Sequence, residues 1–373
     1  MSRSGWVLRS LTSRSASVVL FLLALAFPSE LACLQSSPVA ETWPGVVADL
    51  FALDRRHAWV SINTGTARNY LLATQDGGRS WSCLPFSDPT FQVFFVDPAN
   101  GWILGEPASH PFQLTLFRTS DSGRTWTSLW VFSQGEADYK SITGLAFADR
   151  LHGWFAGKRQ WSGPDRVFRT LDGGRSVLSI DAFSRRFGLS MRVFADQQGD
   201  VWIVGQGSIF YSKDYGESWH QQIAPEQRGL RYASLWGGRS GGRGRAWIVG
   251  QRGGRGIILL TRNYGRDWEV VFDSSEAITL RDLAFWDSEH GCAIGVEAGM
   301  ICTTDGGETW SAANKLPVGD QESSRSFSQI AMFDARKWLV LREDGLLFQT
   351  LDGGVTWRHL DLEASAAQRC PRP

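Results

Sequence analysis

The chain has 373 residues, of which 43% are hydrophobic, so it can bury a large core in one or more domains. Lysine plus arginine and aspartate plus glutamate each number 38. This balance gives no overall field that would draw the protein to nucleic acid or to an anionic membrane. Any recognition of a charged partner must therefore be local, and we expect no nucleic-acid partner.

The predicted elements begin with an export signal. Arg3, Arg9 and Arg14 precede an apolar run over residues 16–27, which is shorter than the about 20 residues that a membrane-spanning helix needs. The order of positive, apolar and polar segments is typical of a secretory signal. Lipid attachment at Cys33 and retention as an uncleaved anchor are the alternatives.

We therefore expect residues 1–32 to be a signal peptide or membrane anchor and residues 33–45 to be a linker. The expected location is periplasmic or otherwise extracytoplasmic, with or without attachment to a membrane through the N-terminus.

A short phrase then returns seven times, and we call it the Asp box. It consists of a hydroxyl residue, a spacer, an acid or its amide, glycine and, in most copies, tryptophan, as in Thr74-Gln-Asp76-Gly-Gly78-Arg-Ser-Trp81. The central acids or amides are Asp76, Asp121, Asp172, Asp214, Asn263, Asp305 and Asp352. Their spacing of 42 to 51 residues predicts four-stranded propeller blades, because helical repeats are shorter.

A second phrase precedes the boxes and gives the strand order. Asn100-Gly-Trp102-Ile-Leu-Gly105 is one copy, and its apolar residues bounded by glycine are typical of a strand. In the fourth repeat the pattern predicts strands over 191–194, 201–204, 209–212 and 219–222. The fold class is therefore predicted as all-β, a seven-bladed propeller over 46–360 with Asp-box turns between the third and fourth strands of each blade.

The Asp boxes are interpreted as structural turns. The carboxylate and the hydroxyl can hydrogen-bond the turn backbone, and glycine accepts a positive φ without steric cost. Twelve of the 18 tryptophans belong to the two phrases, so we expect them to pack the core rather than to form a carbohydrate platform. The third box ends in Val177 and the fifth contains Asn263, which predicts weaker blades. We expect residues 361–373 to be a disordered tail.

These phrases, with Thr304-Asp305-Gly-Gly-Glu-Thr-Trp310 and Thr350-Leu-Asp352-Gly-Gly-Val-Thr-Trp357 as the best copies, resemble the repeats of the photosystem II stability and assembly factor family of cyanobacteria and plastids. The resemblance covers residues 46–360. It implies a seven-bladed propeller that is exported and that, without enzymatic activity, holds membrane-protein precursors during assembly.

A glycan-directed protein is the alternative, because Asp boxes also occur in sialidases and other glycoside hydrolases. A sialidase would need an arginine cluster, a tyrosine nucleophile with a glutamate partner, and a further acid. No pair of carboxylates is marked by the sequence, and phosphate-loop, zinc-protease and serine-hydrolase motifs are absent. A structural module without a dedicated ligand is a third interpretation. We expect no catalytic residues, no cofactor and no metal site.

Charged residues predict a local binding surface. In a propeller, the loops between the second and third strands and between blades share one face, which we call the loop face, and the Asp boxes lie on the opposite box face. Blades 3 to 5 place a basic set on the loop face, with Trp161 beside it as an aromatic anchor. Its arginines are Arg159, Arg166, Arg185, Arg186, Arg228, Arg231, Arg252 and Arg255. The alternative is that these charges are solvated and paired with neighbours.

The run over residues 237–245 is rich in glycine and arginine and is interpreted as a flexible loop between the first two strands of the fifth blade. This interpretation places Arg239, Arg243 and Arg245 on the box face, away from the basic set.

The five cysteines leave two pairings open. Cys292 and Cys302 fall on adjacent predicted strands, and Cys83 and Cys370 could tie the first blade to the C-terminal tail in an oxidising compartment. Small buried thiols are the alternative.

From these features we expect an exported, non-enzymatic scaffold that binds a protein partner, in the assembly or stabilisation of a membrane or envelope complex.

Overall fold

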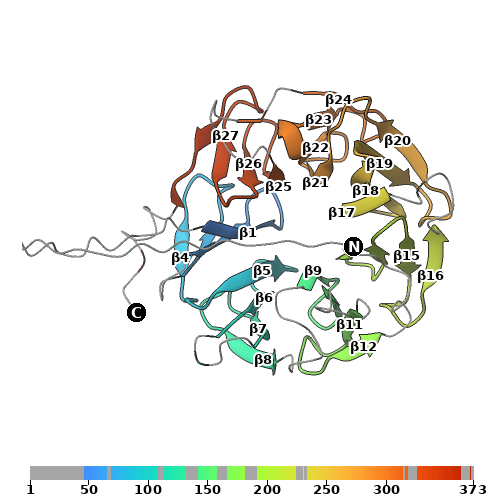
Figure 1. Cartoon of the computed structure of the whole chain (residues 1–373). Coiled ribbons are helices and arrows are strands. Elements are labelled where there is room, and N and C mark those ends of the chain that lie inside the picture. Colours follow the sequence, from blue (N-terminus) through green and yellow to red (C-terminus); the bar gives the residue numbers. More distant parts are fainter. Residues whose placement is uncertain are drawn as a thin grey trace, which may run out of the picture. The chain divides into compact units, whose positions relative to one another are not determined.

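The computed structural model describes residues 46–64, 69–107, 109, 113–131, 142–157, 166–180, 191–223, 230, 233–313, 316–317, 326–362 and 370. Its strands form seven four-stranded sheets arranged around a central axis (Figure 1). Neighbouring strands within a sheet run antiparallel. The predicted all-β, seven-bladed propeller is therefore confirmed. Within the described part of the chain, no helix has the length and hydrophobicity of a membrane span.

Each blade is built from four consecutive strands, with the first nearest the axis (Figure 1). Blades 1 and 2 consist of β1 (Val46–Ala52), β2 (Ala58–Asn63), β3 (Tyr70–Thr74) and β4 (Ser82–Leu84), then β5 (Thr90–Phe95), β6 (Gly101–Gly105), β7 (Thr115–Thr119) and β8 (Thr127–Val131). Blades 3 and 4 consist of β9 (Ile142–Phe147), β10 (Gly153–Gly157), β11 (Arg166–Thr170) and β12 (Leu178–Ile180), then β13 (Arg192–Ala195), β14 (Val201–Val204), β15 (Ile209–Ser212) and β16 (His220–Ile223).

Blades 5 to 7 continue the pattern. They consist of β17 (Ala233–Gly242), β18 (Arg245–Arg252), β19 (Arg255–Thr261) and β20 (Glu269–Asp273), then β21 (Leu280–Phe285), β22 (Gly291–Gly295), β23 (Met300–Thr303) and β24 (Ser311–Ala312), then β25 (Phe327–Met332), β26 (Trp338–Arg342), β27 (Leu347–Thr350) and β28 (Arg358–His359). A short 3-10 turn, η3 (Val296–Ala298), joins β22 to β23. In blade 4 the second and third predicted strands have the observed bounds, and the first and fourth are displaced by one residue.

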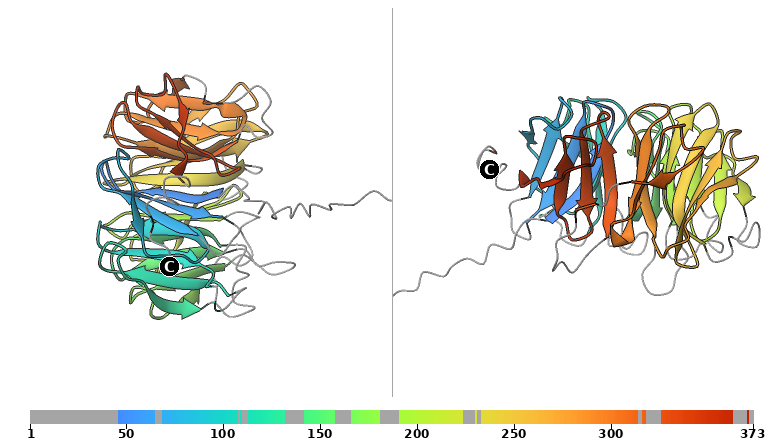
Figure 2. Two further views of the ribbon diagram at one scale, coloured as in Figure 1. Left: turned by 90° about the vertical axis from the view of Figure 1, so that its left-hand side faces the viewer. Right: turned by 90° about the horizontal axis from the view of Figure 1, so that it is seen from above.

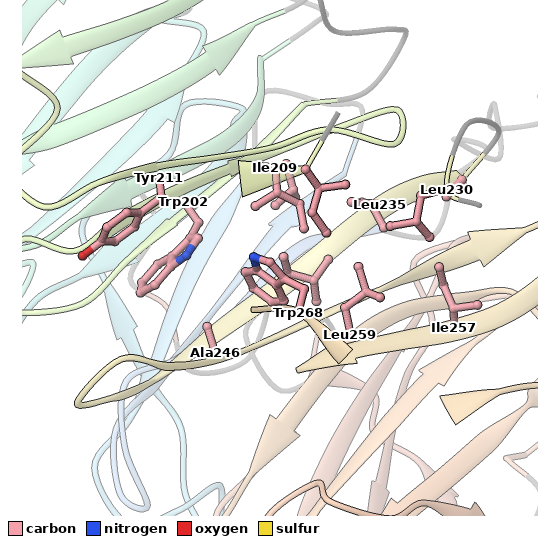
Figure 3. Close-up of a cluster of buried hydrophobic side chains, with 13 residues drawn as sticks. Trp202, Ile209, Tyr211, Leu230, Leu235, Ala246, Ile257, Leu259 and Trp268 are labelled. Atoms are coloured by element: carbon pink, nitrogen blue, oxygen red, sulfur yellow. The ribbon is translucent and has the colours of Figure 1, made fainter. Parts of the chain in front are cut away.

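The hydrophobic core lies between blades, because each sheet buries both faces against its neighbours. Figure 3 shows the cluster between blades 4 and 5, where Trp202 and Ile209 meet Leu235, Leu259 and Trp268. Trp202 is fully buried, as are its counterparts Trp102 and Trp154 in blades 2 and 3. The tryptophans of the second phrase therefore pack the core, as the sequence predicts.

The glycine before this tryptophan has a packing reason. Phe95 of blade 2 stacks on Trp59 of blade 1 with ring centroids 3.6 Å apart, and Phe147 of blade 3 stacks on Trp102 of blade 2 at 3.7 Å. To stack on the tryptophan of the preceding blade, the phenylalanine ring lies directly over the glycine of its own blade. A Cβ on Gly101 would lie 2.5 Å from the Phe95 ring. The repeat therefore encodes one inter-blade aromatic stack.

The structure of residues 237–245 differs from the flexible loop that the sequence predicts. It is not a flexible loop, because residues up to Gly242 belong to β17, which pairs with β18 along its length. Its glycines allow close packing: a Cβ on Gly238 would lie 2.1 Å from the Phe194 ring, and one on Gly237 would lie 2.7 Å from the Arg281 carbonyl oxygen. The neighbouring blades, rather than loop flexibility, explain this composition.

Two disulfides join the four described cysteines. Cys292 and Cys302 are paired across β22 and β23, and Cys83 of β4 is bonded to Cys370. Cys370 lies in the segment that the sequence predicts to be a disordered tail. Both pairings that the sequence left open are therefore present.

Candidate functional site

The Asp boxes lie between the third and fourth strands of the blades, and their acids bind their own turns. The Thr119 hydroxyl donates to Asp121 Oδ1 at 2.8 Å, and the Thr125 hydroxyl donates to Asp121 Oδ2 at 2.6 Å. The Thr125 side chain and main-chain amide thereby hold the pKa of Asp121 at about 2. Both carboxylate oxygens are thus acceptors for groups of the same turn.

In the fifth box the same two positions form a side-chain hydrogen bond, but the donor and the acceptor side chain are exchanged. Asn263 replaces the acid, and its amide Nδ2 donates to Asp267 Oδ2 at 2.9 Å, while the Asp267 main-chain amide donates to Asn263 Oδ1 at 2.9 Å. In the other boxes a serine or threonine occupies the position of Asp267 and donates to the acid. The amide in the fifth box therefore keeps the hydrogen-bonding role that the sequence assigns to this position.

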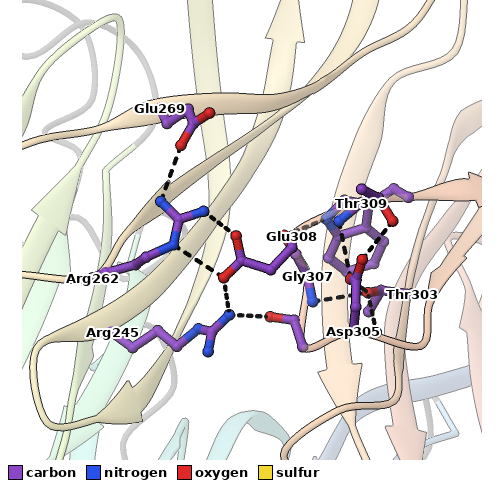
Figure 4. A network of polar contacts seen from close by, with 10 residues as sticks. Arg245, Arg262, Glu269, Thr303, Asp305, Gly307, Glu308 and Thr309 are labelled. Carbon is purple, nitrogen blue, oxygen red and sulfur yellow. Dashed lines mark hydrogen bonds and ion pairs between the residues drawn. The ribbon is translucent and has the colours of Figure 1, made fainter.

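Box turns also contact the preceding blade through charges. Glu308, in the sixth box, forms an ion pair with Arg262 and accepts from Arg245 Nη2 at 2.6 Å (Figure 4). Arg262 Nη1 also contacts Glu269 at 3.0 Å, and the Arg245 guanidinium donates to the Gly306 carbonyl at 2.8 Å. Through this network Arg245 connects blade 5 to blade 6.

The central channel is a cavity of about 790 Å³ that is lined by the innermost strands. Most of these strands are apolar, but charged residues also line the channel. The basic ones, Arg192 of β13, Arg239 of β17 and Arg281 of β21, come from blades 4 to 6. The acidic ones are Asp49, Asp196, Asp282 and Glu343. A volume of this size is in the range of ligand-binding sites.

The arginines of the channel are held in place by their surroundings. The Arg281 guanidinium carbon lies 3.9 Å from the centroid of the Trp236 ring, and Arg281 Nε lies 3.5 Å from Glu343 Oε1. Arg239 Nη2 donates to the Leu283 carbonyl at 3.3 Å. Burial lowers the pKa of Arg192, and the charge of Arg281 lowers it further. Two guanidinium groups from different blades thus act on each other within the channel.

Acidic side chains join the innermost strands of neighbouring blades. The Val93 main-chain amide donates to Asp49 Oδ2 at 2.6 Å, Gln329 Nε2 donates to Asp49 Oδ1 at 2.6 Å, and the Ile330 main-chain amide donates to Asp282 Oδ2 at 3.0 Å. Burial raises the pKa of Asp49 to about 6, even though both oxygens accept hydrogen bonds. Burial also raises the pKa of Asp282, and the charge of Arg239 opposes the rise.

Only part of the predicted basic set lies in the described residues. Arg252 forms an ion pair with Asp273, and Arg255 lies 3.9 Å from the same carboxylate. Arg166 begins β11. The predicted site residues Arg159, Trp161, Arg185, Arg186, Arg228 and Arg231 lie outside the described residues. Arg252 and Arg255 thus share one acid, which is the paired arrangement that the alternative predicts.

Sequence reasoning did not find the channel residues. The sequence pattern gives no role to Arg192 or to Trp236. Arg239 was placed on the box face, whereas it lines the channel. The available signal was the charge itself, because Arg281-Asp282 interrupts an otherwise apolar innermost strand.

One tyrosine–acid pair bears on the glycosidase alternative. The Tyr211 hydroxyl donates to Asp200 Oδ1, and both side chains are buried. Burial and the hydrogen bond to Asp200 raise the pKa of Tyr211, which is the opposite of what activates a tyrosine nucleophile. Among the described residues, no three or more His, Cys, Asp or Glu side chains are grouped so as to hold a metal ion.

Comparisons with known proteins agree with the fold and the repeats. The family described as "Photosynthesis system II assembly factor YCF48" matches residues 260–368. The photosystem II assembly lipoprotein Ycf48 of Synechococcus sp. (strain CC9902) is 26% identical over 296 residues, which covers 76% of this chain and 79% of the relative. The chloroplastic photosystem II stability/assembly factor HCF136 of Arabidopsis thaliana is 25% identical over 311 residues, covering 76% and 70%.

Solved structures show the same fold. A structure titled "YCF48 bound to D1 peptide" has a TM-score of 0.57 at 18% identity and covers 83% of this chain and 94% of that chain. YCF48 from Cyanidioschyzon merolae has a TM-score of 0.58 at 18% identity, covering 85% and 98%. The resemblance drawn from the repeats is therefore confirmed: the chain is a propeller similar to the photosystem II assembly factors.

Proposed function

We propose that the chain is an exported, non-catalytic scaffold that binds a segment of another protein over the mouth of the central channel. The observation that carries the proposal is the entry of Arg192, Arg239 and Arg281 into one channel from three consecutive blades. The Asp-box acids serve as structural residues in this proposal, since they bind their own turns. Its cellular role is assembly or stabilisation of a membrane or envelope complex.

The arginines of the channel, which share its wall with Asp49, Asp196, Asp282 and Glu343, are the groups that would bind an acidic segment. Guanidinium groups bind carboxylates through paired hydrogen bonds, and a half-buried site strengthens such contacts relative to water. Arg192 and Arg281 lie near the starts of β13 and β21, at the loop-face end of the channel. The basic loops that the sequence places on this face would extend the same surface outwards.

The relatives support a protein partner and an extracytoplasmic location. One similar structure is of a propeller bound to a D1 peptide, and the two curated relatives are described as a lipoprotein and as chloroplastic. For this chain we propose residues 1–32 as the export signal or anchor, 33–45 as the linker, 46–360 as the propeller and 361–373 as the tail.

A peptide-binding experiment tests the proposal. A fluorescent peptide rich in Asp and Glu and the same peptide with these residues replaced by Asn and Gln are titrated with the protein, and anisotropy is measured. We expect the acidic peptide to bind more tightly, and Arg192→Gln or Arg239→Gln to weaken its binding about tenfold, since a hydrogen bond to a charged group contributes ~1.5 kcal/mol or more.

Arg243→Gln is the matched control. It makes the same change of charge at the exposed turn of the β17–β18 hairpin, outside the channel lining, and should leave affinity unchanged. Equal binding of the two peptides, or unchanged affinity in both channel variants, would remove the channel from the proposal. Charge reversal at Arg159, Arg186, Arg228 and Arg252 tests the loop-face arginines separately in a pull-down of the partner complex.

A further inference from the structure

The junction between blades 7 and 1, which we call the seam, differs from every other junction in the ring. Blade 1 takes all its strands from β1–β4 and blade 7 takes all its strands from β25–β28. No strand is shared between the first and last blades, whereas the other junctions are crossed by the chain itself. The ring is therefore closed by contacts and by one covalent bond.

Main-chain amides of blade 1 donate hydrogen bonds across the seam. The Val47 main-chain amide donates to the Gly345 carbonyl at 3.2 Å, and the Leu50 main-chain amide donates to Gln329 Oε1 at 2.9 Å. A cluster of buried apolar residues from both blades, including Leu362, packs behind them. The bond between Leu50 and Gln329 joins residues that are 279 positions apart in the sequence.

The covalent bond at the seam is the disulfide between Cys83 and Cys370, which we call the latch disulfide. It joins β4 of blade 1 to a residue beyond the last strand of blade 7, over a sequence separation of 287 residues. The other disulfide, between Cys292 and Cys302, has a separation of 10 residues and lies within one hairpin of blade 6. The latch disulfide thus constrains the whole ring, and the hairpin disulfide constrains only a local pairing.

The two disulfides also differ in access. Both cysteines of the latch, Cys83 and Cys370, are partly exposed, whereas in the hairpin disulfide only Cys302 is partly exposed and Cys292 is fully buried. Thiol–disulfide exchange requires a thiolate to reach a sulfur atom, so exposure favours the latch.

We infer that the latch disulfide is a redox modification site, reduced by a dithiol while the hairpin disulfide stays intact, and that its reduction opens the seam. One thiolate of the dithiol attacks Cys370 Sγ, the sulfur–sulfur bond breaks, and Cys83 leaves and takes a proton. The second thiol of the reductant then attacks the mixed disulfide and releases Cys370 as a thiol. The reductant ends as its own disulfide, with its two protons on Cys83 and Cys370.

Opening the seam would also alter the wall of the central channel. Asp49 and Gln329, which bridge blades 1 and 7, also line the channel wall. Reduction of the latch would therefore change the wall opposite the arginines, and this consequence for partner binding rests on the proposed function. The opening of the seam itself does not.

The first test is selective labelling. The folded protein is treated with dithiothreitol for increasing times, alkylated and analysed by mass spectrometry. We expect Cys83 and Cys370 to be labelled at least tenfold faster than Cys292 and Cys302. Equal rates, or faster labelling of the hairpin pair, would overturn the inference.

The second test measures the seam by amide hydrogen exchange. In the variant Cys83→Ala/Cys370→Ala we expect exchange at Val47 and Leu50 to rise at least tenfold, while Ile330, which binds Asp282 across the junction between blades 6 and 7, keeps its rate. The control Cys292→Ala/Cys302→Ala should leave the seam amides unchanged. Unchanged exchange in the latch variant, or an equal rise at all three amides, would contradict a local opening. Peptide binding by the oxidised wild type, measured in parallel, separates failure of this inference from failure of the proposed function.

Discussion

Asp49 is expected to make the stability of the ring depend on pH. Its side chain is 7% exposed, and burial raises its pKa from 3.8 to about 6 in the folded protein. A folded-state pKa above the unfolded value means that the folded chain holds the proton more tightly. The associated stabilisation is complete below pH 4 and is lost as the pH rises through 6. A rise from 3.8 to about 6 corresponds to ~3 kcal/mol.

The variant Asp49→Asn isolates this contribution. An asparagine still offers an oxygen to the Val93 amide, but its own amide group faces the Gln329 Nε2 donor, so it loses one hydrogen bond at all pH values. The lost bond costs about 1 kcal/mol and does not titrate. The difference in unfolding free energy, variant minus wild type, should therefore become more positive by up to ~3 kcal/mol between pH 4 and pH 7.

Urea unfolding at several pH values, with the disulfides intact, measures this difference. Asp121→Asn is the control: hydrogen bonds from Thr125 lower the pKa of Asp121 to about 2, so its stabilisation is present above pH 4 and is lost as the pH falls. The difference for Asp121→Asn should therefore stay constant between pH 4 and pH 7, and below pH 4 it should change with pH in the opposite sense to that for Asp49→Asn. A pH-independent difference for Asp49→Asn would refute the argument from burial.

Two further predictions concern contacts of the Asp-box turns. Glu308→Gln should lower the unfolding free energy by about 0.5–1 kcal/mol, because the ion pairs with Arg262 and Arg245 are partly exposed, and the loss should shrink when chemical unfolding is repeated in 1 M salt. Gly173→Ala should cost about 2 kcal/mol or more in thermal unfolding, since φ is +75° and the new Cβ would lie 2.6 Å from the Arg150 carbonyl oxygen, whereas Gly242→Ala, with a similar φ and open space, should cost less.

The parts of the fold that the sequence predicts are those that each blade repeats. The hydroxyl–acid–glycine turn is satisfied within eight residues, so Thr119, Asp121 and Thr125 determine it locally. The Gly101-Trp102 pair is equally predictable, because it recurs in the repeats, and at two junctions the tryptophan stacks on a phenylalanine of the next blade. A turn or contact that each blade forms from nearby residues, and that recurs at a fixed spacing, can therefore be predicted from the sequence alone.

The channel residues could not be predicted in this way. Arg192, Arg239 and Arg281 belong to three different blades, and only the closure of the ring brings them into one cavity. The run over 237–245 misled for a related reason: its glycines admit Phe194 and the Arg281 backbone from neighbouring blades, and no feature of the run itself identifies those neighbours.

This division between repeated and unrepeated residues separates stability from recognition. The box acids use their oxygens within their own turns, and the second-phrase tryptophans are buried between sheets, so neither set can readily change its partner. The innermost strands are less constrained, because one blade bonds its neighbour through Asp282 whereas another approaches its neighbour through Gly237. Because the innermost strands contact their neighbours in different ways, one of their positions can also hold an arginine that lines the channel. Specificity can therefore change at these positions while the repeats keep the ring intact.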